Sequence, residues 1–153
     1  MIDLYASLND SSTTGIKLID DEHKLIITLF NDLRQIGKTN KDLLLNYINL
    51  FIKQFIFHCL DEEDFMKKIG YPELNKHRAQ HQSLIRIFEG LKATIETEIS
   101  DSYSVFNFYL FFIGHVLISD ILIRDYYFDN NLHAGPKILP SIEQCLTSQR
   151  QLF

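Results

Sequence analysis

Histidines and acids recur along this sequence at spacings that suit a metal site. His58 and Glu62 are four residues apart, and so are His77 and His81. Residues four apart in an α-helix lie on one face, one turn along the axis, so each pair can direct two side chains at the same point. Imidazole and carboxylate groups are ligands of transition metals. The two pairs therefore predict a metal site between two helices.

Three further residues extend this prediction to two more helical stretches. His23 lies near the start of the chain, and His115 and Asp120 lie in its last apolar stretch. His115 and Asp120 are five residues apart, which is roughly 140° around a regular α-helix. Ser119 has the better spacing, so Asp120 needs a long reach or a local bulge to face the same point as His115. Spacing alone therefore ranks Asp120 below the other candidate ligands.

Each of these residues also has a simpler interpretation. A lone histidine on an apolar face, such as His23 or His115, is more often a hydrogen-bonded core residue than a ligand. Glu62 belongs to an acidic run at 61–64, which taken alone predicts a solvated face. Together, however, five imidazoles and two carboxylates on four helices would need many hydrogen bonds to be buried without a metal. The whole set therefore favours a metal site inside a bundle.

Four helical stretches position these residues. Apolar residues recur at helical spacing over about 19–36, 41–69, 72–98 and 103–127. Asp20 or Asp21 is a candidate N-cap of the first stretch, and Asn40 of the second. No stretch predicts a strand of consequence. The sequence predicts an all-α, up-down-up-down four-helix bundle over residues 1–130, followed by a C-terminal tail at 131–153.

Composition and charge disfavour several kinds of partner. The 153 residues carry a net charge of −5, which argues against nucleic acid and anionic membranes as partners. The stretch 105–123 is long and apolar enough to span a bilayer, but His115 and Asp120 would be costly in lipid, so we expect a buried helix. The first residues show no signal-peptide pattern, and Cys59 and Cys145 form no CxxC pair. We therefore expect a cytoplasmic protein.

Four motifs follow one another along the chain. They are Ile19-Asp20-Asp21-Glu22-His23, His58-Cys59-Leu60-Asp61-Glu62-Glu63-Asp64-Phe65-Met66, His77-Arg78-Ala79-Gln80-His81 and His115-Val116-Leu117-Ile118-Ser119-Asp120. Their order resembles the hemerythrin family, whose pattern is Ile-Asp-x-x-His, His-x-x-x-Glu-Glu-x-x-Met, His-x-x-x-His and His-x-x-x-x-Asp. The resemblance covers roughly residues 15–127 and fills all of the family's ligand positions. The five-residue step to Asp120 is the family's own.

This resemblance implies a non-haem di-iron centre that binds dioxygen. Glu62 and Asp120 would bridge the two irons, which would share an oxo or hydroxo group. The imidazoles would divide as His77, His81 and His115 on one iron and His23 and His58 on the other. Counted against octahedral geometry, these ligands leave one position open, on the iron with fewer histidines. Because neutral imidazoles disfavour high-valent iron, the resemblance implies reversible binding of dioxygen rather than oxidation of a substrate.

Two departures from the family pattern concern the site. Phe111 and Phe112 stand where the family usually has Trp-Leu before the last histidine. We expect Phe112 in the dioxygen pocket, where its bulk would affect oxygen access. Cys59 replaces the usual Phe after His58. We expect Cys59 to pack rather than react, with a redox-sensing thiol as the alternative.

The fourth helical stretch is apolar nearly all round, so it needs cover on more than one side. That cover would come from the C-terminal tail, in which 141–152 is compatible with a short helix, or from a homodimer.

Function also has alternatives. Storage, delivery or sensing of oxygen leads, and we expect no enzyme. A di-iron oxidase, peroxidase or nitric-oxide-handling enzyme follows, and an iron-handling or repair protein comes third.

Overall fold

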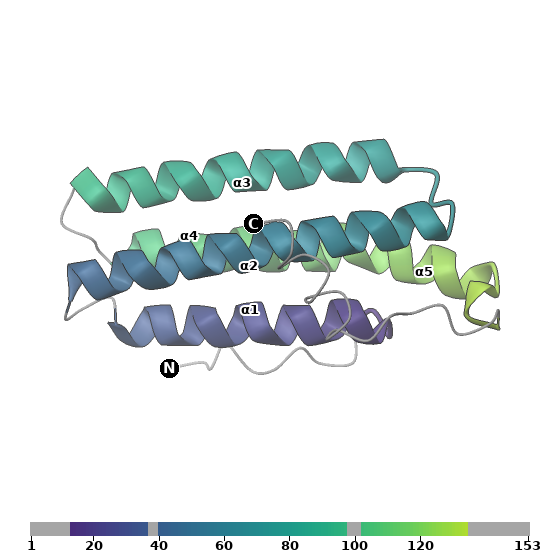
Figure 1. The fold of residues 1–153 in the computed structure, drawn as a ribbon, viewed down its shortest axis with the longest axis horizontal. Helices are drawn as coiled ribbons and strands as arrows, with labels where there is room; N and C mark the ends of the chain where they lie inside the picture. Colours follow the sequence, from purple (N-terminus) through teal and green to yellow (C-terminus); the bar gives the residue numbers. More distant parts are fainter. Residues whose placement is uncertain (1–12, 37–39, 98–101, 135–153) are drawn as a thin grey trace, which may run out of the picture.

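The computed structural model describes residues 13–36, 40–97 and 102–134 of this chain. The regular structure of these residues is entirely helical. It comprises α1 (Lys17–Ile36), α2 (Lys41–Lys68), α3 (Leu74–Thr97), α4 (Ser102–His115), the π-helical turn η1 (Val116–Asp120), α5 (Ile121–Asp129) and the 3-10 turn η2 (Leu132–Ala134). Successive long helices run in opposite directions, and α4, η1 and α5 follow one another as the fourth of them (Figure 1). The predicted all-α four-helix bundle is confirmed.

The carboxylate of Asp20, in the first turn of α1, stabilises the start of this helix by hydrogen bonds. The helix begins at Lys17, earlier than predicted, so Asp20 does not stand before it as an N-cap. Instead, Asp20 accepts hydrogen bonds from the amides of Thr14 at 2.7 Å and Gly15 at 3.0 Å. Gly15 has a φ of +71°, and the ring of Phe128 lies so close that a Cβ there would be 3.2 Å from its Cε2. The start of α1 is thereby packed against the end of α5.

The boundaries of α2 and α3 follow local capping chemistry. Asn40 is the N-cap of α2, and its side chain accepts a hydrogen bond from Leu43 N at 3.0 Å, as predicted. After α2, Gly70 adopts a φ of +68°, the left-handed conformation that glycine tolerates best. α3 begins at Leu74 and not at Pro72, because the residues between form turns before the regular helix starts.

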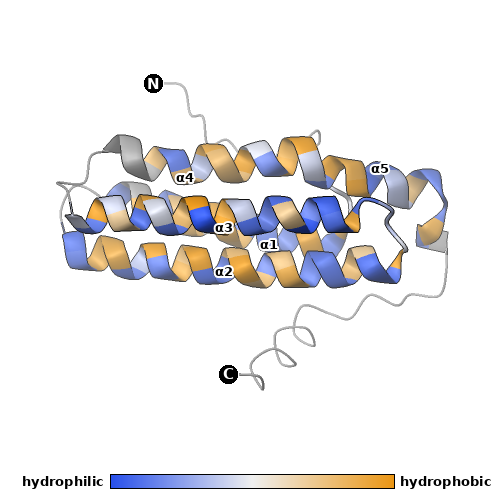
Figure 2. Cartoon of the chain, turned by 90° about the horizontal axis from the view of Figure 1, so that it is seen from above, coloured by the Kyte–Doolittle hydropathy of each residue, from blue (hydrophilic) through white to orange (hydrophobic). Residues whose placement is uncertain are grey.

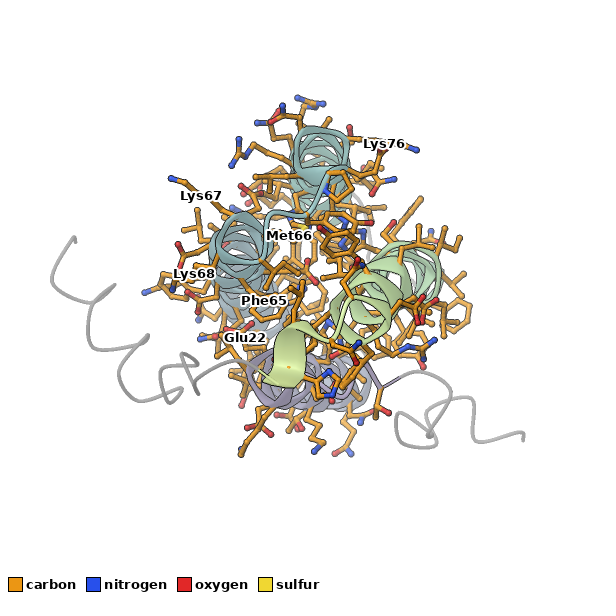
Figure 3. All side chains as sticks on the ribbon, turned by 90° about the vertical axis from the view of Figure 1, so that its right-hand side faces the viewer. Glu22, Phe65, Met66, Lys67, Lys68 and Lys76 are labelled. Atoms are coloured by element: carbon orange, nitrogen blue, oxygen red, sulfur yellow. The ribbon has the colours of Figure 1, made fainter. Side chains whose placement is uncertain are left out.

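Two apolar clusters fill the interior of the bundle. The larger one is rich in aromatic rings, including Phe51, Phe55, Phe88 and Phe108. The smaller one lies toward the α5 end of the bundle and contains residues of α1, α2 and α5 and of the segments beside them, namely Ile16, Ile19, Phe65, Met66, Tyr71 and Ile123. An end-on view shows Phe65 and Met66 directed into the bundle, whereas Lys67 and Lys68 point to solvent (Figure 3). Along every helix, the predicted metal ligands fall between these two clusters.

Two helices are long and apolar enough to cross a membrane by length and composition, namely α2 and the continuous run Phe106–Asp129. Hydropathy colouring shows the same apolar character along α4, next to a more mixed α3 (Figure 2). Core helices of a bundle meet the same criterion. Both helices also carry buried acids and imidazoles, which would be costly to place in lipid. The absence of a membrane partner stays a prediction.

Candidate metal centre

All the predicted ligands meet in one buried layer of the bundle. Every helix contributes, because His23 lies on α1, His58 and Glu62 on α2, His77 and His81 on α3, His115 at the end of α4 and Asp120 at the end of η1. None of these seven residues is more than 6% exposed. Their nitrogen and oxygen atoms form three overlapping groups, within each of which all the atoms lie within 4.8 Å of one another. These groups are candidate metal-binding positions.

One half of the layer contains three imidazoles. The Nε2 atom of His81 lies 3.0 Å from the Nε2 atoms of both His77 and His115. Glu62 Oε2 lies 2.9 Å from His77 Nε2 and 3.1 Å from His81 Nε2. Asp120 Oδ1 is 3.1 Å from His115 Nε2. We call this the three-imidazole half.

The other half contains two imidazoles and shares both carboxylates with the first. His23 Nε2 lies 3.1 Å from Asp120 Oδ2, the second oxygen of the same carboxylate. His58 Nε2 lies 3.8 Å from Glu62 Oε2 and 4.0 Å from Asp120 Oδ2. We call this the two-imidazole half. Glu62 and Asp120 therefore stand between the two groups of imidazoles, where bridging ligands belong.

The π-helical turn brings Asp120 into the site. Val116–Asp120 is a π-helix that follows His115 directly. A π turn accommodates one more residue than an α turn, so two residues five apart can face the same point. The bulge that the spacing of His115 and Asp120 required is confirmed. Sequence periodicity placed Asp120 lowest among the candidate ligands because periodicity assumes a regular helix.

The two shared carboxylates have opposite electrostatic environments. Burial opposes the ionisation of Glu62, but the nearby charge of His58 and hydrogen bonds with His77 and His81 hold its pKa well below the usual range. Burial raises the pKa of Asp120 well above the usual range, and the negative charge of Glu62 adds to this shift. Without a cation, two buried carboxylates this close cannot both ionise easily. A bound cation would favour the ionised form of both.

Two of the imidazoles favour the neutral form, which is the form that binds metal. Burial lowers the pKa of His23 and that of His115, so both favour the neutral ring. For His81, burial acts in the same direction, but hydrogen bonds and the charge of Glu62 raise its pKa overall. Neutral imidazoles and ionised carboxylates are the species that coordinate a metal ion.

Several buried polar atoms have no hydrogen-bond partner in the described residues. They are both ring nitrogens of His23, His58 Nε2, Glu62 Oε1 and both carboxylate oxygens of Asp120. Leaving a buried polar atom unpaired costs about 1–3 kcal/mol, and more for a charged group. These atoms belong to residues of the three groups that converge on the layer. The residues present therefore fit metal ions, which would satisfy these atoms.

Two glutamates outside the predicted set orient the ligands. Glu22 Oε2 lies 3.1 Å from His58 Nδ1, and Glu63 Oε1 lies 2.9 Å from His81 Nδ1. The Nε atom of Arg78 donates to Glu63 Oε2 at 2.7 Å and holds this carboxylate in place. Such carboxylate–imidazole contacts fix the tautomer of a ligating histidine and raise its basicity. The prediction from sequence missed both glutamates, although each directly adjoins a predicted ligand in the sequence.

Phe112 and Cys59 both lie beside the two-imidazole half. Phe112 is fully buried, and its ring contacts the rings of His23 at 5.6 Å and His58 at 6.4 Å between centroids, both edge to face. Its predicted role in a dioxygen pocket stays a prediction. Cys59 lies in the larger apolar cluster, and burial raises the pKa of its thiol. A buried thiol of this kind is poorly reactive, which favours packing over redox sensing.

Comparison with known proteins identifies the family to which this bundle belongs. The family model described as the hemerythrin HHE cation-binding domain matches residues 14–116. The chain belongs to the hemerythrin family. Bacteriohemerythrin of Methylococcus capsulatus is 29% identical over 80 residues, which cover 52% of this chain and 61% of that protein. Myohemerythrin of Theromyzon tessulatum is 28% identical over 80 residues, covering 52% of this chain and 62% of that protein. The match thus spans about three-fifths of each relative's length.

Solved hemerythrin structures share the fold. The crystal structure of a wild-type hemerythrin superposes with a TM-score of 0.65 at 22% identity, covering 71% of this chain and 86% of that one. A single-residue variant of hemerythrin gives a TM-score of 0.67 at 22% identity and covers 74% of this chain and 88% of that one. About a quarter of this hemerythrin-family chain therefore lies outside the shared bundle.

Proposed function

We propose that this protein binds dioxygen reversibly at a non-haem di-iron centre. The observation that carries this proposal is the unequal division of the buried imidazoles around two shared carboxylates. In the proposed assignment, Glu62 and Asp120 would be shared by the two irons. His77, His81 and His115 would hold one iron, and His23 and His58 the other. The iron with fewer imidazoles would then have room for a small molecule.

Iron supplies the redox-active metal to which dioxygen binds, and the protein supplies the environment. The apolar clusters on both sides of the layer keep water away from the ligands. Glu22 and Glu63 hold His58 and His81 in one orientation. Phe112 stands over the two-imidazole half and limits the space beside His23 and His58. Membership of the hemerythrin family supports iron as the metal and oxygen binding as the activity.

An optical titration tests the proposal. The iron-loaded protein is reduced under argon, exposed to air and returned to argon while its absorption spectrum is recorded. We expect a visible charge-transfer band that forms in air and is lost under argon over repeated cycles. Direct and irreversible conversion to the oxidised spectrum would contradict the proposal and favour a redox enzyme. Rapid loss of iron to a weak chelator would favour an iron-handling protein.

A further inference from the structure

Five large apolar side chains are exposed along the fourth helix. They are Leu110, Phe111, Leu117, Ile118 and Leu122, and we call them the apolar stripe. Their exposed fractions run from 42% for Phe111 to 70% for Ile118. Together they expose on the order of 500 Å² of apolar surface, which is at the upper end for a patch on a soluble monomer. Single exposed apolar residues need no explanation, but five along one helix do.

Beside this stripe, a groove of about 640 Å³ runs between α3 and the fourth helix. One wall is formed by Leu110, Phe111 and Ile118 of the stripe. The opposite wall, on α3, combines the short side chains of Ala79 and Ser83 with the longer, polar Lys76 and Gln80 and the apolar Leu84. The groove also reaches His115 and Ser119, on the flank of the three-imidazole half. Whatever covers the stripe also covers this flank of the candidate metal centre.

The chain itself supplies a segment with the right chemistry, which lies outside the described residues. In the sequence from 135 to 153, Ile142, Cys145 and Leu146 recur at helical spacing. Ser141 followed three residues later by Gln144 matches a capping box, the sequence pattern of a helix start. This predicts a short helix with one apolar face over 141–152.

Length and position also fit. The 12 residues from Ser141 to Leu152 would span about 18 Å as a helix, the same length as the stripe from Leu110 to Leu122. The described chain ends at Ala134, a few residues past α5, and α5 directly continues the helix that carries the stripe. Residues 135–140 can extend over about 20 Å, which is enough to return a helix alongside α4.

A second copy of the chain is the competing occupant. A dimer interface of about 800 Å² on each partner contains roughly 450–500 Å² of apolar surface, which the stripe could also supply. The length and sequence of the segment after Ala134 favour the segment of the same chain. The solved relatives superpose on about three-quarters of this chain or less, so the surplus sequence and the uncovered stripe occur together in one protein.

We propose that residues 141–152 form a helix that docks on the apolar stripe and covers the groove between α3 and the fourth helix. The apolar face of Ile142, Cys145 and Leu146 packs against Phe111, Ile118 and their neighbours. The docked segment shields the His115 flank of the bundle. This inference does not depend on dioxygen binding, because it rests on surface and sequence alone.

A cysteine placed on the stripe tests the proposal in the full-length chain. Ile118→Cys puts a thiol opposite the natural Cys145, and mild oxidation with diamide joins thiols that lie within reach. We expect an intramolecular disulfide between positions 118 and 145, detected as a cross-linked peptide by mass spectrometry. Leu50→Cys is the matched control, because Leu50 is also an exposed apolar residue but lies on α2. The control should give no such cross-link.

Two outcomes would overturn the proposal. One is a 118–118 disulfide between two chains, together with a dimer of the unmodified protein in sedimentation, which would assign the stripe to a second copy. The other is the absence of any cross-link to Cys145 while the variant remains folded by circular dichroism. A second measurement does not need the new cysteine. Leu146→Asp should speed the reaction of Cys145 with a thiol reagent at least tenfold, whereas Ser148→Asp, outside the apolar face, should leave that rate unchanged.

Discussion

The two halves of the candidate metal centre are built differently. In the three-imidazole half, His81 Nε2 lies 3.0 Å from the Nε2 atoms of both His77 and His115. In the two-imidazole half, the ring nitrogens of His23 and His58 lie 3.1 to 4.0 Å from the carboxylates, with the ring of Phe112 beside them. Donors are therefore crowded on one side of the shared carboxylates and sparse on the other.

This difference predicts that the three-imidazole half retains its metal ion, whereas the two-imidazole half binds the small molecule. A metal ion surrounded by protein donors is held firmly and has little room for another ligand, whereas one with fewer donors is open to a small molecule. In this chain the crowded half is oriented by Glu63 and Arg78, and the sparse half by Glu22. The asymmetry gives each residue a distinct expected effect when it is replaced.

The largest effect is expected from Glu62, which both halves share. Glu62→Ala removes a carboxylate that lies within 4.0 Å of all three imidazoles on α3 and α4, so we expect at least tenfold less bound iron. Metal analysis of the purified variant measures this. Asp64→Ala, an exposed acid on the same helix, should keep its iron. Full iron content in Glu62→Ala would mean that the halves do not share this ligand.

The π-helical turn connects His115 in one half with Asp120, which reaches both. Deleting Ile118, its most exposed residue, leaves the two ligands four apart, which suits a regular α-helix. We therefore expect the deletion variant to fold and to bind iron. Deleting Leu110 from the regular part of α4 should abolish iron binding, because it rotates everything beyond it by about 100°. If the Ile118 deletion variant also lost its iron, the π turn would have a role beyond turning Asp120 toward the same point as His115.

The orienting glutamates should act on separate halves. Glu63→Ala removes the partner of His81, and Glu22→Ala removes that of His58. Losing such a partner typically lowers metal affinity by roughly 10–100-fold. In a chelator titration we expect each variant to release one iron early and the other at the normal chelator concentration. Equal weakening of both irons would contradict the division into halves. Glu89→Ala, an exposed acid on α3, serves as the control.

The smallest effect on metal content is expected at Phe112. Replacing this residue should instead change how fast small molecules reach the metal centre. Phe112→Leu makes space next to His23 and His58 at a stability cost of about 1–2 kcal/mol. We expect unchanged iron content and faster binding of azide or dioxygen, measured by stopped flow. Phe111→Leu changes the neighbouring exposed ring and should leave the binding rate as it is. If both variants bound at the original rate, Phe112 would not control entry.

Much of this site could be predicted from sequence because helical spacing fixes direction. His58 with Glu62 and His77 with His81 face one layer because they lie one turn apart in regular helices. Asp120 was the exception, since its orientation depends on a π turn that periodicity cannot anticipate. The family resemblance supplied this residue where spacing failed.

The parts that sequence did not predict depend on contacts between helices. The pairing of Glu22 with His58 and that of Glu63 with His81 each join different helices, α1 to α2 and α2 to α3. Such pairings depend on how neighbouring helices are rotated and shifted, which a single helix does not encode. The start of α1 was misplaced for a related reason, because Asp20 binds the amides that precede the helix instead of capping it from outside.

The contact between Gly15 and the ring of Phe128 has a consequence for the topology of the chain. Because this contact brings the start of the first helix to the end of the last, the bundle forms a nearly closed circuit. Chains whose ends meet at a surface tolerate circular permutation and insertion into loops of other proteins. A permuted bundle joined between Thr14 and Asn130, and opened between α1 and α2, would keep α1 to α5 and all the candidate ligands. The same closure would let the bundle be inserted whole into a host protein.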